Sequence, residues 1–313
     1  MLTESKIDII IVNWNTGEFL NKCLDSIKKY GGDQISSTTV VDNNSDDSSH
    51  NCVQNYENVT LINLTKNLGF AKACNVGAMN SKGKYYLFLN PDTRLEKDTI
   101  RKVVHFMELE SSKNIGICGV QLYDDSDLPT YSCCRFPSLS NHFFYATGLS
   151  KFFPNLGAPM REWEHTDSRK VDQVMGAFFF IRAKLFIDLK GFDERFFIYY
   201  EEVDISYRAR LRNCKSFFLS DARAYHFGGG SSRNVKAKRI FYSQRSRILY
   251  AFKHYSVLSC FFTIIISLFI EPISRILFSL LNFSMKGFTE GLKAYIMLAV
   301  WAPNLVKKEY RNS

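Results

Sequence analysis

The first 120 residues constrain the fold most, because short β-branched apolar runs alternate there with longer amphipathic segments. Strands are expected at residues 7–13, 38–42, 59–63, 85–89 and 115–120. Helices are expected between them, at residues 17–30, 46–56, 70–80 and 96–110. This alternation predicts an α/β fold with a mainly parallel sheet flanked by helices.

The pattern is less regular in the second half of the chain. Residues 123–170 have weak periodicity, four prolines and many aromatic side chains, which favours an irregular loop region. Further elements are expected as a strand at 171–182, a turn at 191–193, a helix at 202–213, a strand pair at 217–219 and 222–226, and a basic helix at 236–255.

A basic stretch beside an apolar one distinguishes the C-terminal region. The formal net charge is +9, and residues 222–270 contain eight lysines and arginines but no aspartate or glutamate. The last part of this stretch, 257–270, is uncharged. Glu271-Pro272 is expected to interrupt it before two further apolar stretches, at 273–283 and 294–301.

Basic and apolar stretches side by side favour a lipid partner, and no nucleic-acid partner is expected. We expect helices that lie in the interface of an anionic membrane surface as a peripheral or monotopic anchor. A full span stays open, since extending the apolar run crosses only Glu271 and Arg275. A solvated helix face is the plain alternative for the basic stretch.

Eight cysteines are scattered without the spacing of a metal finger, and several lie inside apolar runs, which fits a reducing compartment. The first expected strand follows the N-terminus without a secretory signal. The folded N-terminal part is therefore expected in the cytosol.

Polar residues follow the expected strands where the strands end. They are Asn13-Trp14-Asn15, Asp42-Asn43-Asn44-Ser45, Asn67-Leu68-Gly69 and Asn90-Pro91-Asp92. Ligands bind beyond the carboxyl ends of the strands in parallel α/β sheets, so these positions are candidates for a binding site. Asp42 could accept a hydrogen bond from a pyrimidine N–H, or cap the helix expected after it. Gly69 could let the backbone approach a nucleotide, or supply a positive φ angle.

Asp92 is the first of two acidic features. A carboxylate after a strand can hold a divalent cation, Mg²⁺ or Mn²⁺, on a diphosphate, because phosphate oxygens and water complete the shell of a hard cation. Its ordinary alternative is a turn residue or a helix cap. His226 ends the last expected strand and could complete the metal shell or contact phosphate, or be structural.

The second acidic feature comprises Glu201, Glu202 and Asp204, directly after the aromatic run 196–200. A hydroxyl that attacks the anomeric carbon of a sugar must lose a proton, and any of these carboxylates could be the general base. Stabilisation by the dipole of a helix start is the plain alternative. A metal-holding acid and a base together indicate transfer of a sugar from a nucleotide carrier.

Eight motifs stand in a fixed order, at residues 9–15, 41–45, 67–71, 89–92, 176–178, 191–197, 200–204 and 226–230. In this order they resemble the family 2 inverting glycosyltransferases of GT-A fold, especially the bacterial rhamnosyltransferase-like branch. The resemblance covers about residues 7–235. It implies a nucleotide-diphospho-sugar transferase fold and a single displacement with inversion.

The resemblance also implies roles for individual residues. Asp42 would contact the nucleotide base, Asp92 would take the metal position of an Asp-x-Asp motif, and His226 would lie near the metal. The nucleotide-sugar site would comprise Asn13, Asn15, Asp42, Asn67, Gly69, Asn90 and Asp92.

Two positions depart from the family pattern. The Glu-Asp pair of relatives reads Glu201-Glu202 here, so Glu202 is the expected base and Glu201 or Asp204 could share the role. Asn90 replaces the first acid of the general Asp-x-Asp pattern. With one carboxylate fewer, metal and donor are expected to bind together.

The expected protein has a glycosyltransferase domain at residues 1–235 and a helical, membrane-associating region at 236–313. Its expected reaction moves L-rhamnose from dTDP-L-rhamnose, or another sugar from a UDP-sugar, onto a lipid-linked oligosaccharide. The expected setting is O-antigen or capsule-type synthesis at the cytoplasmic face of the inner membrane. Two alternatives are a non-catalytic membrane scaffold and a sugar-1-phosphate nucleotidyltransferase. The second would need a basic, glycine-rich loop after the first strand, which residues 14–18 do not provide.

Overall fold

A computed structural model describes residues 6–228 and 235–309 of the chain. The chain forms two compact units. A sheet unit contains the described residues of Met1–Phe136, Pro159–Phe197 and Glu201–Ser231. A helical unit contains those of Pro137–Ala158, Ile198–Tyr200 and Ser232–Ser313.

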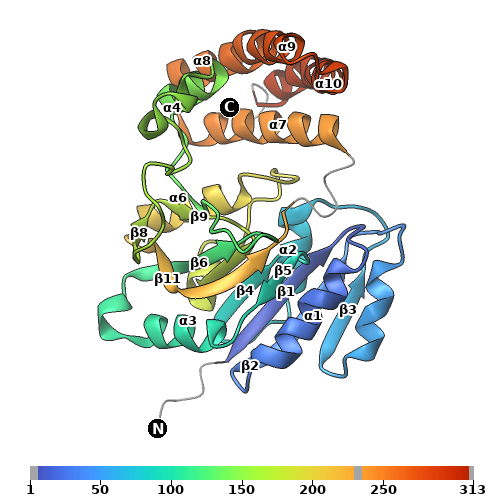
Figure 1. The fold of residues 1–313 in the computed structure, drawn as a ribbon, viewed down its shortest axis with the longest axis vertical. Coiled ribbons are helices and arrows are strands. Elements are labelled where there is room, and N and C mark those ends of the chain that lie inside the picture. Colours follow the sequence, from blue (N-terminus) through green and yellow to red (C-terminus); the bar gives the residue numbers. More distant parts are fainter. Residues whose placement is uncertain (1–5, 229–234, 310–313) are drawn as a thin grey trace. The chain divides into compact units, whose positions relative to one another are not determined.

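The sheet unit is built on one large sheet in the strand order β3-β2-β1-β4-β10-β6-β11-β5, with β8 also paired to β11 (Figure 1). Its strands are β1 (Ile7–Asn13), β2 (Ile35–Asp42), β3 (Val59–Asn63), β4 (Tyr85–Leu89), β5 (Thr93–Leu95), β6 (Ile115–Tyr123), β8 (Arg169–Val171), β10 (Phe178–Arg182) and β11 (Lys215–His226). The first four strands are parallel, as are β6 and β11, whereas β10, β5 and β8 run antiparallel to their neighbours. The expected α/β fold with a mainly parallel sheet is confirmed.

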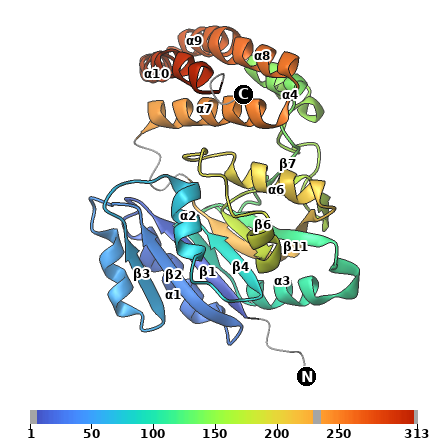
Figure 2. The same ribbon diagram turned by 180° about the vertical axis from the view of Figure 1, so that it is seen from behind.

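Helices cover both faces of this sheet, which explains why every residue of β1 is buried. Ile9 and Ile11 pack in a core with α1 (Phe19–Tyr30) and α3 (Thr99–Glu108). The alternate residue Ile10 packs in a second core with α2 (Phe70–Ala78), α5 (Ala183–Asp188) and α6 (Glu201–Leu211). Figure 1 shows α1 and α3 in front of the sheet, and Figure 2 shows α2 in front of its other face.

Three expected elements of the sheet unit differ from the structure. Residues 46–56 form a 3-10 turn, η1 (Ser49–Asn55), because the Asp47 side chain accepts from the backbone N–H groups of Ser49 and Gly17 in competition with an α-helix. The strand expected at 171–182 is divided: β9 (Gln173–Val174) pairs with β7 (Cys133–Cys134) in a separate small sheet, and β10 joins the main one. The pair expected at 217–226 is the single strand β11, whose register shift between Leu219 and Arg223 absorbs the intervening residues.

The helical unit contains α4 (Leu139–Ala146), α7 (Lys236–His254), α8 (Val257–Ile265), α9 (Glu271–Leu281) and α10 (Met285–Glu309). Short turns η2 (Glu110–Ser112), η3 (Leu149–Lys151) and η4 (Pro154–Leu156) complete the described elements of the two units. In Figure 1, α10 runs beside α7 and α9, with which it packs.

The interruption expected at Glu271-Pro272 is wrong. A π-helical turn, η5 (Ile266–Ile270), joins α8 to α9, so that Val257–Leu281 is one continuous helix. Pro272 lies in the first turn of α9, where its missing N–H is tolerated, and the wider π turn precedes it. Among the described residues, this is one helix long and apolar enough to cross a membrane, by length and composition alone.

Candidate active site

The ends of β1 and β2 form a buried polar pair. Asn13 lies opposite Asp42 in the parallel register, and its Nδ2 donates to Asp42 Oδ1 at 2.7 Å. Asp42 also accepts from Ser45, through the backbone N–H at 2.9 Å and the hydroxyl at 2.7 Å. Asn15 reinforces the same loop, since its Oδ1 accepts from Asp46 N–H at 2.7 Å. The Asp42 carboxylate is thus fixed in orientation at the edge of the sheet.

The loop before α2 is tied to the same edge by Asn43. Its side chain donates to Asn67 Oδ1 at 3.1 Å and accepts from Leu68 N–H at 2.8 Å. Gly69 follows with a φ of 86°, and a Cβ built there would lie 2.5 Å from the carbonyl oxygen of Phe197. Only glycine fits this close approach. Phe197 in turn leads towards the second acidic feature, so the backbone contact joins two motifs that are distant in sequence.

Asp92 and His226 meet because β5 and β11 pair. Thr93 lies opposite His226 in the antiparallel register, and Phe227 N–H donates to the backbone oxygen of Asp92 at 3.1 Å. Asp92 is buried and His226 is partly buried, and His226 Nε2 lies 3.4 Å from Asp92 Oδ1. Asn90 forms the turn between β4 and β5, its carbonyl accepting from Thr93 N–H at 3.0 Å.

These two side chains fit a divalent cation that takes further ligands from elsewhere. Two neighbouring ligands at right angles on Mg²⁺ or Mn²⁺ lie about 3 Å apart, given bonds of about 2.1 Å, which is close to the Asp92–His226 spacing. No group of three or more metal-ligating side chains occurs among the residues that the structure describes. A cation here would depend on ligands such as diphosphate oxygens and water. The glycine-rich residues 229–230 beyond His226 lie outside the described residues.

Glu201 and Glu202 stand in the first turn of α6. Burial, together with the neighbouring Glu202 carboxylate, raises the pKa of Glu201 well above its ordinary value. Glu201 Oε2 is buried without a hydrogen-bond partner. Glu202 is less buried, and its side chain lies over Gly176, where an added Cβ would be 3.8 Å from Glu202 Cγ. The acidic pair therefore presents one carboxyl that favours the protonated form beside a second carboxyl on a less buried residue, whose Oε2 is itself enclosed.

Asp204 has a different setting on the same helix. It is fully buried and pairs with Arg208, whose Nε lies 2.7 Å from its Oδ2. Arg208 also donates to the backbone oxygens of Leu189 and Gly191 at 2.6 and 2.9 Å. These bonds tie α6 to the expected turn at Gly191.

Sequence reasoning did not single out the supporting residues Asn43, Ser49 and Arg208. Ser49 receives a bond from Asn13 Nδ2 at 2.8 Å. Asn43 was visible as part of a strand-end motif, but its role in joining two loops depends on the fold. Arg208 stands four residues after Asp204, a helical ion-pair spacing that could have marked it.

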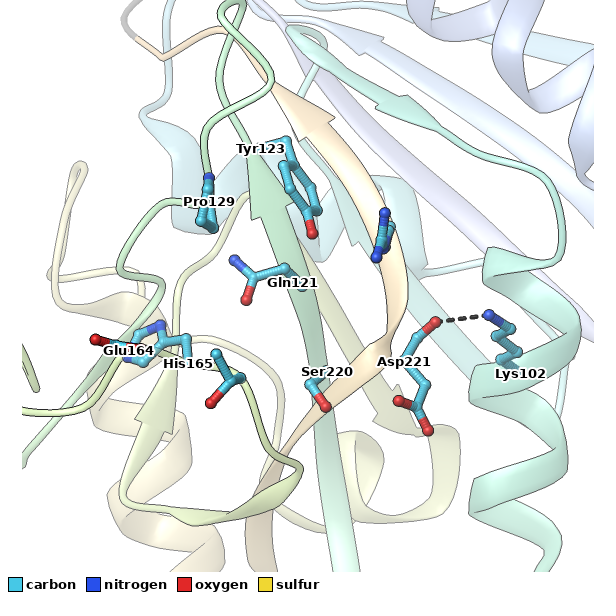
Figure 3. A pocket seen from close by; sticks show the side chains of 10 residues that line it. Lys102, Gln121, Tyr123, Pro129, Glu164, His165, Ser220 and Asp221 are labelled. Carbon is cyan, nitrogen blue, oxygen red and sulfur yellow. Dashed lines mark hydrogen bonds between the residues drawn. The ribbon is translucent and has the colours of Figure 1, made fainter.

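A separate cavity of 690 Å³ opens in the sheet unit, among α3, β6, β11 and the loop around His165 (Figure 3). Lys102 donates to the backbone oxygen of Asp221 at 2.7 Å on its rim (Figure 3). None of the predicted site residues lines this cavity. It is therefore not the site that the strand-end motifs indicate.

Comparisons with known proteins show the family of the chain. The sequence profile described as Glycosyl transferase family 2 matches residues 8–157, and that of Glycosyl transferase family group 2 matches residues 86–306. The chain is 25% identical over 252 residues to the rhamnosyltransferase WbbL of Escherichia coli K12, covering 77% of this chain and 91% of that protein. It is 24% identical over 259 residues to the N-acetylglucosaminyl-diphospho-decaprenol L-rhamnosyltransferase of Mycobacterium tuberculosis H37Rv, covering 78% and 83%.

Two solved structures are similar in fold. One is the mannosyltransferase PcManGT of Pyrobaculum calidifontis in complex with GDP-Man and Mn²⁺, with a TM-score of 0.56 and 14% identity over 98% of this chain and 82% of that one. The other is residues 1–349 of TarS from S. aureus, with a TM-score of 0.51 and 16% identity over 96% of this chain and 92% of that one.

Proposed function

The chain belongs to the family 2 glycosyltransferases of GT-A fold, and on that premise we propose that it is an inverting rhamnosyltransferase using dTDP-L-rhamnose. The observation that carries the transferase proposal is the Asp92–His226 pair beside the strand ends. The choice of L-rhamnose is supported by the two rhamnosyltransferase relatives. The proposed acceptor is a lipid-linked oligosaccharide of the O-antigen or capsule type, supported by the decaprenol-linked substrate in the name of one relative.

Asp42 is the proposed contact for the thymine base. An ionised carboxylate has about four acceptor positions, and Asn13 and Ser45 occupy three of them. The remaining position on Oδ2 suits the N–H of a pyrimidine. The rest of the proposed donor site lies in the loops at the same strand ends and comprises Asn15, Asn67, Gly69 and Asn90.

Asp92 and His226 are the proposed ligands of Mg²⁺ or Mn²⁺. The bound cation would neutralise charge on the departing nucleoside diphosphate. The solved neighbour with GDP-Man and Mn²⁺ supports a divalent cation without distinguishing between the two metals. Since the chain offers one carboxylate here, the donor diphosphate would supply the other oxygen ligands.

Glu202 is the proposed general base. It would accept the proton of the acceptor hydroxyl as that oxygen attacks the anomeric carbon from the face opposite the diphosphate. Glu201, with its raised pKa, would hold a proton and leave Glu202 as the ionised member of the pair. The ion pair with Arg208 favours a structural role for Asp204.

The helical unit is the proposed attachment to an anionic membrane at the cytoplasmic face. Large apolar side chains are exposed along α8, η5, α9 and α10, including Phe269, Leu281 and Met285. Lys236, Lys238 and Arg239 stand in the first turn of α7 of the same unit. Exposed apolar area combined with basic residues suits an interfacial helix assembly.

The test is release of nucleoside diphosphate from a panel of dTDP-, UDP- and GDP-sugars with Mg²⁺ or Mn²⁺ and membranes that contain acceptor. We expect release with dTDP-L-rhamnose and loss of it in Asp92→Asn. A non-catalytic scaffold would release none with any donor. Faster release with another sugar nucleotide would keep the transferase and overturn the rhamnosyl assignment.

A further inference from the structure

The backbone immediately before the acidic pair is strained. Tyr199 and Tyr200 both have positive φ angles, of 68° and 72°, which bulky side chains rarely adopt. Each such residue is strained and persists only where its surroundings hold it. Glu201 follows directly as the first residue of α6. The two strained residues thus lead directly into the first turn of α6.

Two consecutive residues of α7 hold this segment. Ser246 Oγ donates to the backbone oxygen of Ile198 at 2.9 Å, and Arg247 Nε donates to Tyr200 Oη at 3.2 Å. The Tyr200 ring also lies against that of Tyr250, one turn along α7, with centroids 5.5 Å apart. The hydroxyl and ring of Tyr200 and the backbone carbonyl of Ile198 are therefore all held by α7.

Arg247 is itself oriented by a glutamate from the long apolar helix. Its Nη1 lies 2.7 Å from Glu271 Oε2 and 3.1 Å from Gln244 Oε1. Glu271 is 2% exposed and also accepts from Gln244 and Arg275, at 2.6 and 2.9 Å. A buried carboxylate without partners is strongly unfavourable, so these partners are needed to keep Glu271 in place. Only Glu271 and Arg275 are charged within Val257–Leu281.

We propose that Arg247 and Glu271 are positioning residues for the general base. Glu271 orients Arg247, Arg247 holds the Tyr200 hydroxyl, and Tyr200 fixes the strained backbone from which Glu201 and Glu202 start. This inference rests on the proposed role of Glu202. It assigns a catalytic purpose to the two charges of a helix that is otherwise apolar.

The cleanest test is Tyr200→Phe, which removes the bond to Arg247 and keeps the ring and the Arg247–Glu271 pair. Loss of a hydrogen bond to a charged group predicts a fall in kcat of roughly tenfold. The KM for the sugar nucleotide and its Kd by calorimetry should stay within twofold, since no proposed donor contact changes. Arg247→Lys keeps the positive charge but removes the guanidinium, which donates to Tyr200 and Glu271 at once, so it should lower kcat similarly.

Tyr295→Phe is the matched control. Tyr295 Oη accepts from Arg275 Nε at 3.1 Å, so this variant removes a similar bond in the same network without touching residues 198–200. We expect its kcat to be unchanged. Equal losses in Tyr295→Phe and Tyr200→Phe would show that the network only stabilises the unit, and would overturn the inference.

A double-mutant comparison separates this inference from the proposed function. If Tyr200 acts through the base, Tyr200→Phe should have no further effect on kcat once Glu202→Gln has removed that base. A full tenfold loss in both backgrounds would overturn the positioning role. Wild-type kcat in Glu202→Gln would instead overturn the proposed base, and no diphosphate release by the unaltered protein would overturn the proposed function.

Discussion

His226 Nε2 lies 3.4 Å from Asp92 Oδ1 because antiparallel pairing of β5 with β11 places Thr93 opposite His226. The pair brings the residue directly before β5 together with the last residue of β11. Two side chains are enough for a diphosphate-bound cation, since protein sites of this kind commonly use one or two and fill the rest of the shell from the substrate and water.

Loss of the His226 imidazole should weaken metal binding more than it weakens folding. We expect His226→Asn to raise the Mn²⁺ concentration for half-maximal diphosphate release by at least tenfold, with a thermal midpoint within about 2 °C of wild type. Titration of activity with metal checks this. His105→Asn, at an exposed position of α3, is the control and should leave the titration unchanged. An unaltered metal requirement in His226→Asn would remove His226 from the metal site.

Gly69 should tolerate no side chain, because space and backbone angle both oppose one. Gly69→Ala would place a Cβ 2.5 Å from the Phe197 oxygen, whereas Gly32→Ala, also at positive φ, would meet nothing within 4 Å. Gly32→Ala should cost about 1 kcal/mol in unfolding free energy, from the backbone angle alone. Gly69→Ala should cost clearly more and also weaken donor binding. Equal losses of unfolding free energy in Gly69→Ala and Gly32→Ala, measured in urea, would show that the backbone at Phe197 moves to accommodate the added Cβ.

The strand ends could be predicted from sequence because both their apolar runs and their polar endings are local. β1, β3 and β4 have the expected boundaries. The turn at Ser49–Asn55 could not, since it depends on the Asp47 carboxylate bonding across to Gly17. A role in nucleotide binding could be predicted for Asp42 from sequence. The hydrogen bond from Asn13 that orients the Asp42 carboxylate could not, because it depends on the register of β1 on β2.

The polar centre of the helical unit was equally hidden in the sequence. Glu271 looked like the end of an apolar run, yet it is the point where α4, α7 and α9 meet through His142, Arg247 and Arg275. Residues 137–158 have too weak a periodicity to show that they pack with helices a hundred residues later. Such partners become visible only when the chain is folded.

Glu201→Gln should stabilise the protein at high pH and keep its activity, whereas Glu202→Gln should lose activity. Because the folded pKa of Glu201 is raised above its ordinary value of 4.5, the unfolded chain releases a proton that the folded one keeps, and stability falls as pH rises above 4.5. Glu201→Gln mimics the protonated form, so it should raise the thermal midpoint at pH 8 and lose that advantage below pH 4.5. It should also keep most activity at pH 7, whereas Glu202→Gln should lose it. Equal inactivation of both variants would contradict this division of roles.

His142 should make the helical unit sensitive to acid. Burial lowers the pKa of His142 from 6.5 to about 4. The Glu271 carboxylate raises this pKa and the Arg247 guanidinium lowers it, but burial has the largest effect. Between these pH values the unfolded chain takes up a proton that the folded one does not, so stability falls by up to about 3 kcal/mol as pH drops. Urea unfolding of wild type and His142→Asn at pH 7 and pH 4.5 checks this. The same acid loss in both proteins would assign it to other groups.

Membrane attachment through the helical unit can be tested on one stripe of α9. Ile273, Leu277 and Leu281 are spaced by four residues and are 60%, 54% and 77% exposed, so they share a face that gains free energy by entering the lipid interface. Replacing all three by Ser should reduce co-sedimentation with anionic vesicles at least tenfold and leave diphosphate release with a soluble acceptor analogue intact. Ile187→Ser, on α5 of the sheet unit and 62% exposed, is the control and should bind vesicles as wild type does. Unchanged sedimentation of the triple variant would place the attachment elsewhere.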